Sequence, residues 1–254
     1  MPCGVRSDGH AAPTGAQWSD RRLDGSATRA KTDRIDAELI AHFLIFRPEA
    51  GRTLPAEHLR LLRALTTRRA QMVEMRKRLL AQIRAHRKSG TAELFKDIDL
   101  ELKERLDGAI AELESRISEL LGRDSRLADT ARILRSVPGI GPVASSTLIA
   151  ELPELGVLTG EEAAALTGLA PVAQDSGTLR GKRVIAGGRR ALRHVLFQAA
   201  LLASHHNPTF KAFADRLRKA GKSHKVIVTA VARKLVIIAN ALCKSRREWE
   251  PRHP

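Results

Sequence analysis

A serine in a turn-like triplet, Asp175-Ser176-Gly177, precedes a dense run of cations in the stretch APVAQDSGTLRGKRVIAGGRRALRH, residues 170–194. Those cations are Arg180, Lys182, Arg183, Arg189, Arg190 and Arg193. A hydroxyl is a weak nucleophile, and guanidinium groups that hold a phosphate and stabilise developing charge would help it attack a phosphodiester. The same triplet is also typical of a loop that only binds phosphate, or of an ordinary solvated turn, so spacing alone leaves three alternatives for Ser176.

Two carboxylates, Asp33 and Asp36, stand three residues apart in KTDRIDAELI, where apolar residues recur at helical spacing. Residues three apart project from one face of a helix, so these two acids could share a divalent cation such as magnesium. Acids in a first helical turn also complement the helix dipole, and Lys31 and Arg34 could pair with them. The pair by itself therefore leaves both interpretations open.

Two glycines, Gly139 and Gly141, lie in the run VPGIGP between two helical stretches, which is the pattern of a helix-hairpin-helix turn. Glycines let the backbone approach a phosphate, and the following helix would point its first N–H groups at the same phosphate. The pattern also occurs where two helices simply pack tightly. Nucleic-acid binding and tight packing are both compatible with it.

The positive charge of the chain is concentrated near its C-terminus. The net charge is +16, and between Arg180 and Arg247 there are 17 Lys or Arg against one acid, while the rest of the chain balances 27 cations with 27 acids. A one-sided basic region of this kind predicts a polyanionic partner and an affinity that falls steeply with salt. Lys222 and Lys225, in the basic stretch RKAGKSHK, complete the candidate nucleic-acid-binding set.

The elements that must position these residues are predicted to be helices, so the expected fold class is mainly α. Residues 1–30 have no helical or strand period and are expected to be disordered or loosely attached; residues 31–50 carry one helical pattern. In residues 55–125 two long apolar seams, separated at Lys88-Ser89-Gly90, predict an antiparallel helical hairpin or coiled coil that acts as a spacer or dimerises. Residues 126–247 are expected to form a compact basic helical domain, with a small β-hairpin at residues 178–185.

Cellular location follows from what the chain lacks. Its nearest approach to the roughly 20 apolar residues of a membrane span is Val226 to Cys243, which Arg233 and Lys234 interrupt. The two cysteines have no spacing typical of a zinc site or a disulfide framework. We therefore expect an internal, cytoplasmic protein with no membrane partner.

Four segments together resemble a known family: KTDRIDAELIA, SVPGIGPVASSTLIAELPELG, ALTGLAPVAQDSGTLRGKRVIAGGRRALRHVLFQAAL and HHNPTFKAFADRLRKAGKSHKVIVTAVARKL. They look like the DEDD-type insertion-sequence transposases of family one-ten, over about residues 30–247. The resemblance implies a RuvC-like domain whose four acids bind magnesium, then a coiled coil, then a C-terminal domain with a serine nucleophile. On these positions Asp33 and Asp36 resemble the last two acids, and Ser176 resembles the serine.

The resemblance further implies a site that cleaves and joins DNA strands, a structured guide RNA (the bridge RNA), homo-oligomeric partners and a bacterial, nucleoid-associated location. The first two acids of the family, and the parallel sheet that carries them, should precede KTDRID, where residues 1–30 show no strand pattern. We therefore expect an N-terminally truncated copy, in which the RuvC-like domain is largely missing, the metal site is incomplete and catalysis is impaired. The alternatives are an inactive nucleic-acid-binding remnant or oligomerising regulator, and a purely structural coiled-coil protein.

Overall fold

The computed structural model describes residue 41, residues 57–172 and residues 184–250. The chain divides into two compact units, residues 1–54 and 55–254, and every element discussed below belongs to the second. Its helices are α2 (Glu57–Ser89), α3 (Ala92–Arg123), α4 (Ser125–Ser136), α5 (Pro142–Glu151), α6 (Gly160–Leu166), α7 (Arg190–His206), α8 (Pro208–Lys219) and α9 (His224–Ser245). Two short strands, β1 (Pro171–Val172) and β2 (Val184–Ile185), complete the described part. The mainly α fold class is thereby confirmed.

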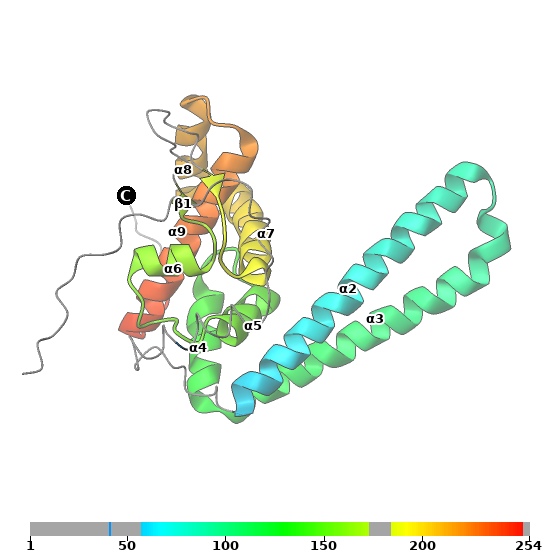
Figure 1. Ribbon diagram of the computed structural model, residues 1–254, viewed down its shortest axis with the longest axis horizontal. Helices are drawn as coiled ribbons and strands as arrows, with labels where there is room; N and C mark the ends of the chain where they lie inside the picture. Colours follow the sequence, from blue (N-terminus) through cyan, green and yellow to red (C-terminus); the bar gives the residue numbers. More distant parts are fainter. Residues whose placement is uncertain (1–40, 42–56, 173–183, 251–254) are drawn as a thin grey trace, which may run out of the picture. The chain divides into compact units, whose positions relative to one another are not determined.

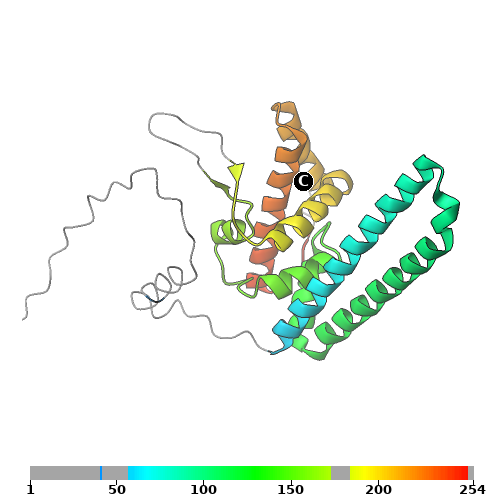
Figure 2. The ribbon, with the colours of Figure 1, turned by 45° about the vertical axis from the view of Figure 1, so that its right-hand side comes forward.

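Helices α2 and α3 lie side by side as an antiparallel hairpin (Figures 1 and 2). Its interface buries the apolar seams predicted from the sequence, with Leu62, Met72 and Leu79 from α2 and Ile110 and Ile117 from α3. The turn follows at the predicted place. Gly90 donates its N–H to the Arg87 carbonyl, and Thr91 donates to the His86 carbonyl, which closes the end of α2 and reverses the chain.

Two ion pairs connect α2 and α3 beside the buried apolar seam. Arg69 contacts Glu114 at 2.6 Å and Arg76 contacts Asp107 at 2.7 Å. The hydrogen bond from Arg76, together with one from Lys103, lowers the pKa of the Asp107 carboxyl below its usual value. The two arginines thus link the two helices through their head groups.

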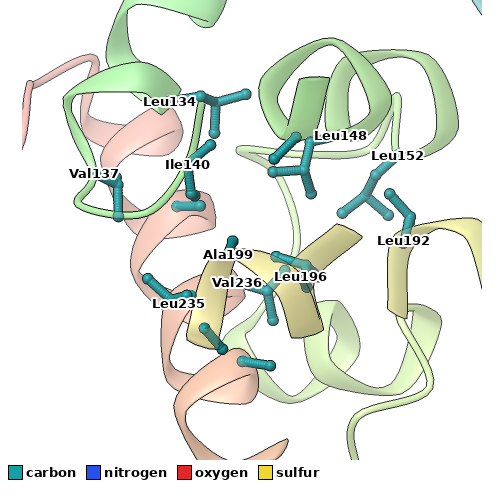
Figure 3. Close-up of a cluster of buried hydrophobic side chains, with 14 of the residues drawn as sticks. Leu134, Val137, Ile140, Leu148, Leu152, Leu192, Leu196, Ala199, Leu235 and Val236 are labelled. Atoms are coloured by element: carbon teal, nitrogen blue, oxygen red, sulfur yellow. The ribbon is translucent and has the colours of Figure 1, made fainter. Parts of the chain in front are cut away.

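The core of the remaining helices surrounds α9, which packs against α4, α6, α7 and α8. Figure 3 shows part of this cluster, with side chains from α4, α5, α7, α9 and the adjoining loops facing one another: Leu134, Val137, Ile140, Leu148, Leu152, Leu192, Leu196, Ala199, Leu235 and Val236. The burial of α9 explains its composition. It is the one helix in the described ranges that is long and apolar enough to cross a membrane, and half of that apolar window is buried inside the fold.

Local capping sets where several helices begin. The Asp124 carboxylate accepts from the N–H groups of Arg126 and Leu127 and starts α4. Thr159 and Glu162 form a reciprocal capping box that starts α6, and the backbone N–H of Thr159 lowers the pKa of the Glu162 carboxyl. These caps use side chains that the sequence already places at the expected offsets.

The segment after α9 returns to α4. Trp249 stacks on Phe210 of α8 with ring centroids 5.8 Å apart, and its backbone N–H donates to the Ser136 hydroxyl at 2.7 Å. Glu248 pairs with Arg132 of α4. Residues 248 and 249 are therefore fixed against α4 and α8.

Candidate functional site

The serine-bearing segment is closed at its base by the small antiparallel ribbon. Pro171 pairs with Ile185 and Val172 pairs with Val184, so residues 173–183 connect two paired strands. Ser176, Arg180, Lys182 and Arg183 belong to that connection and lie outside the described residues. The sequence predicts a β-hairpin within residues 178–185, of which residues 178–183 lie outside the described residues. The described strand Val184–Ile185 pairs with Pro171–Val172, which precedes the serine and which local alternation did not reveal.

Two glycines hold the exit of this segment against the end of α6. Gly188 has φ +67°, and a Cβ placed on it would lie 2.2 Å from the backbone nitrogen of Gly168. A Cβ on Gly168, whose φ is +68°, would lie 2.4 Å from the Gly187 carbonyl oxygen. The backbones touch here only because neither residue has a side chain. The next residue, Arg189, donates its backbone N–H to the Leu166 carbonyl at 2.8 Å.

Arg189 is held in a bidentate ion pair. Its Nη1 and Nη2 donate to the two carboxylate oxygens of Glu154 at 2.8 and 2.7 Å, and Nη1 also donates to the Glu151 carbonyl at 2.6 Å. The side chain of Arg189 is 19% exposed. The hydrogen bonds to Glu154 raise the pKa of this guanidinium above its ordinary value, against the opposing effect of burial.

The two arginines that follow differ from Arg189 in their surroundings. Arg190, the first residue of α7, is exposed. Arg193, one turn further along, donates from Nη1 to the Gly187 carbonyl at 2.7 Å. Of the three predicted nucleic-acid ligands at the start of α7, Arg190 is thus the most accessible to a phosphate.

The turn between α4 and α5 contains one packed and one open glycine. Gly139 has φ +91°, and a Cβ there would lie 2.5 Å from the Ala199 carbonyl of α7. Gly141 precedes Pro142 at the start of α5 and has open space around its Cα. Gly139 is therefore required for close helix packing, while Gly141 is the glycine that an approaching phosphate could reach.

The connection between α8 and α9 is a second group of exposed cations. Lys222 and Lys225 are both exposed, and so are Arg218 and Lys219 just before them. Close by, Phe213 of α8 lies beneath two cations, with Lys234 Nζ 4.7 Å and Arg216 Cζ 5.3 Å from its ring centroid. The structure thus places Lys222 in the connection before α9 and Lys225 in the first turn of α9, and both are exposed.

A metal site is not formed by the residues that the structure describes: over residues 57–172 and 184–250 there is no group of three or more His, Cys, Asp or Glu that could hold an ion. Asp33 and Asp36, the predicted magnesium ligands, fall outside these ranges. We therefore derive no chemical step through a metal from this structure.

Sequence reasoning missed Glu154, the partner of Arg189. A signal existed nearby: Glu151 lies in the last turn of α5, where the helix dipole disfavours an acid, and Glu154 follows shortly after. Acids at the carboxyl end of a helix indicate that cations stand close to them. The identity of that cation, 35 residues away along the chain, has no local signature.

Two family models match this chain. Residues 131–215 match the model described as the transposase IS116/IS110/IS902 family; the match includes the Ser176 segment, the whole of α5, α6 and α7, and parts of α4 and α8. Residues 13–89 match a DEDD transposase model of IS110, described as a transposase, which includes Asp33, Asp36 and α2. The two matches do not overlap and together cover more than half of the chain.

Curated relatives agree with these models. The pilin gene-inverting protein of Moraxella bovis is 27% identical over 88% of this chain and 69% of its own length. The insertion element IS110 uncharacterized 43.6 kDa protein of Streptomyces coelicolor is 28% identical over 56% of this chain and 35% of its own. The insertion element IS116 uncharacterized 44.8 kDa protein of Streptomyces clavuligerus is 30% identical over 59% and 37%, respectively.

The helical domain with its basic, serine-bearing segment is thus that of an insertion-sequence transposase. Within this class the chain belongs to the IS110 family, as the resemblance of its motifs predicted.

Proposed function

We propose that this transposase binds DNA through its basic C-terminal region and that Ser176 is the nucleophile of strand cleavage and joining. The observation that carries this proposal is the pairing of Val172 with Val184, which brings both ends of the Ser176 segment together directly before α7 and its exposed Arg190. A nucleophile presented between fixed ends, with cations beside it, suits attack on a phosphodiester.

In the proposed reaction the Ser176 hydroxyl oxygen attacks a backbone phosphorus. One P–O bond to the serine forms, one P–O bond to a sugar breaks, the serine gives up its proton and the departing sugar oxygen gains one. A hydroxyl of the joining strand then attacks the phosphoserine, which restores the serine. Arg180, Arg183 and Arg190 would stabilise the charge on the phosphate oxygens, and Lys182 would add to the local field.

Binding would use two described surfaces besides the serine segment. One carries the exposed Lys222 and Lys225, and the other is the open Gly141 at the start of α5. Lysine and arginine contacts to phosphates release counterions, so affinity should fall steeply as salt rises. A structured guide RNA is a polyanion of the same kind and is included in the proposal on the basis of the family resemblance.

Self-association is proposed through the α2–α3 hairpin. Leu94, Ile98 and Leu102 recur every four residues on α3 and are all exposed, which makes an apolar stripe on one side of that helix. A second copy of this chain could cover such a stripe. Magnesium bound by Asp33 and Asp36, and a location in the bacterial cytoplasm near the nucleoid, complete the proposal.

The deciding experiment is a cleavage and joining assay with magnesium, DNA carrying the element ends and the cognate RNA, comparing the chain with Ser176→Ala. Loss of both cleavage and joining in the variant, with DNA binding retained, supports the proposal. Cleavage that does not depend on the serine contradicts it. Binding without cleavage in either protein identifies the alternative function, a nucleic-acid-binding regulator.

A second candidate function is DNA inversion, which is favoured by the similarity to the pilin gene-inverting protein of Moraxella bovis. Inversion and transposition share strand cleavage and joining and differ in the arrangement of the two sites. Two element ends placed in inverted orientation on one plasmid distinguish them, because inversion flips the intervening DNA and transposition moves it to another molecule.

A further inference from the structure

We propose that Arg189 is a positioning residue rather than a phosphate ligand: its ion pair with Glu154 fixes the start of α7 and with it the exit of the Ser176 segment. This inference rests on the proposed function of Ser176. It divides the basic run after the serine into cations that contact nucleic acid and one that holds the fold of the site.

The guanidinium of Arg189 is already occupied. Both of its terminal nitrogens donate to the Glu154 carboxylate, and Nη1 makes a further bond of 2.6 Å to the Glu151 carbonyl. A planar guanidinium recognises a phosphate with the same pair of nitrogens that it uses for a carboxylate. A phosphate could therefore bind here only by displacing Glu154 from a side chain that is already mostly buried.

The backbone around Arg189 connects this ion pair to the serine segment. Residues 187–189 follow β2 after Ala186, and two contacts hold them against the end of α6: the Gly188 to Gly168 backbone approach and the Arg189 N–H to the Leu166 carbonyl. The Arg193 side chain, which donates to the Gly187 carbonyl, ties the same residues to α7. Glu154 lies in the loop after α5. The ion pair therefore ties that loop to the point where the segment ends and α7 begins.

The neighbouring Arg190 supplies a matched comparison, because it has the same charge as Arg189 and follows it directly in the chain but is exposed. If both arginines bound phosphate, replacing either one would lower the dependence of DNA affinity on salt. If Arg189 positions the site, only the replacement of Arg190 should do so, by about one unit of the slope of log affinity against log salt.

The experiment uses the full chain and the variants Glu154→Gln, Arg189→Ala and Arg190→Ala, so that each arginine is replaced in the same way. Glu154→Gln removes the ion pair and leaves every cation in place. We expect Glu154→Gln and Arg189→Ala to slow serine-dependent cleavage by roughly ten- to hundredfold, as a displaced reacting group does, with DNA affinity and its salt slope unchanged. The exchanged pair, Arg189→Glu with Glu154→Arg, should cleave faster than either of its single variants. Tighter DNA binding by Glu154→Gln, without loss of cleavage, would show that Arg189 is a ligand freed by the substitution and would overturn the inference.

A second measurement does not depend on activity. Amide hydrogen exchange over residues 184–194 should become faster in Glu154→Gln and Arg189→Ala and remain at the wild-type rate in Arg190→Ala. Unchanged exchange in the first two variants would overturn the positioning role. If Ser176→Ala cleaves as fast as the wild type while the exchange results hold, the proposed nucleophile fails and the structural role of the ion pair stands.

Discussion

Gly168 and Gly188, twenty residues apart, meet backbone to backbone, so that a Cβ on Gly188 would lie 2.2 Å from the Gly168 nitrogen and 2.5 Å from its Cα. The contact joins the end of α6 to the residue before Arg189. It excludes every side chain larger than hydrogen at position 188. The adjacent Gly187 provides a control for a stability test of this contact.

Gly188→Ala should lower the free energy of unfolding by roughly 2–4 kcal/mol, because alanine disfavours φ +67° and its methyl group collides with backbone that cannot move aside. Gly187→Ala faces a similar φ of +66° in open space and should cost only about 1 kcal/mol. Denaturant titration of both variants gives the comparison. Equal losses would mean that the two backbones are not in contact.

The two glycines of the turn between α4 and α5 allow packing and DNA binding to be tested separately. Gly139→Ala should destabilise the fold by roughly 2–4 kcal/mol, because its Cβ would meet the Ala199 carbonyl at 2.5 Å. Gly141→Ala should cost less than about 1 kcal/mol, since the site is open and only a helix cap preference is lost. DNA affinity measured on folded protein should fall for Gly141→Ala if this turn contacts phosphate, and an unchanged affinity would remove the turn from the proposed interface.

Asn240 joins α9 to the loop before α6. Its Oδ1 accepts from the Gly156 N–H at 2.8 Å and its Nδ2 donates to the Leu158 carbonyl at 2.7 Å. Asn240→Ala leaves both backbone groups without these partners and should cost about 1–3 kcal/mol. The melting temperature of Asn240→Ala, compared with that of Gln198→Ala, checks this prediction, because Gln198 is an exposed helix residue whose replacement should have little effect. Equal melting temperatures of the two variants would show that water replaces the Asn240 amide without loss of stability.

The burial of the Cys243 thiol leads us to expect that the folded protein loses stability in alkaline solution. Burial raises the pKa of this thiol to about 11, whereas in the unfolded chain it ionises near its ordinary value. Because the folded pKa is the higher one, the stabilisation is complete below the unfolded pKa and is lost as pH rises toward about 11. The free energy of unfolding of the wild type should therefore decline relative to that of Cys243→Ala over this range, by roughly 2–3 kcal/mol.

Thiol reactivity gives an independent check on the same residue. In a Cys3→Ser background, Cys243 should react with a disulfide reagent near pH 8 far more slowly than it does in denaturant, because the folded thiol is buried and protonated. Rapid reaction in the folded protein would contradict the burial of Cys243 against the core.

The sequence was informative wherever the geometry is local. Apolar seams at steps of three and four predicted the α2–α3 hairpin, and Gly90 marked its turn, because helical periodicity depends only on residues within two turns of each other. The composition of the basic region likewise identified which part of the chain carries the positive charge.

Sequence pattern failed where two distant segments meet. The partner of β2 lies at Pro171–Val172, beyond the serine, and the Glu154–Arg189 pair spans 35 residues. Neither leaves a periodic trace, because tertiary contacts are set by how helices pack. The run of cations was predicted, but only packing distinguishes the occupied Arg189 from the exposed Arg190 beside it.

The ribbon between Val172 and Val184 has a consequence for how this protein can vary. A connection whose two ends are tied together adds only about 0.6 kcal/mol of closure entropy each time its length doubles. Residues can thus be inserted, deleted or exchanged between the two valines with little effect on the helices that hold them. The sequence that carries Ser176 can therefore change in evolution, and with it the reaction of the serine, without a large change in the stability of the helical domain.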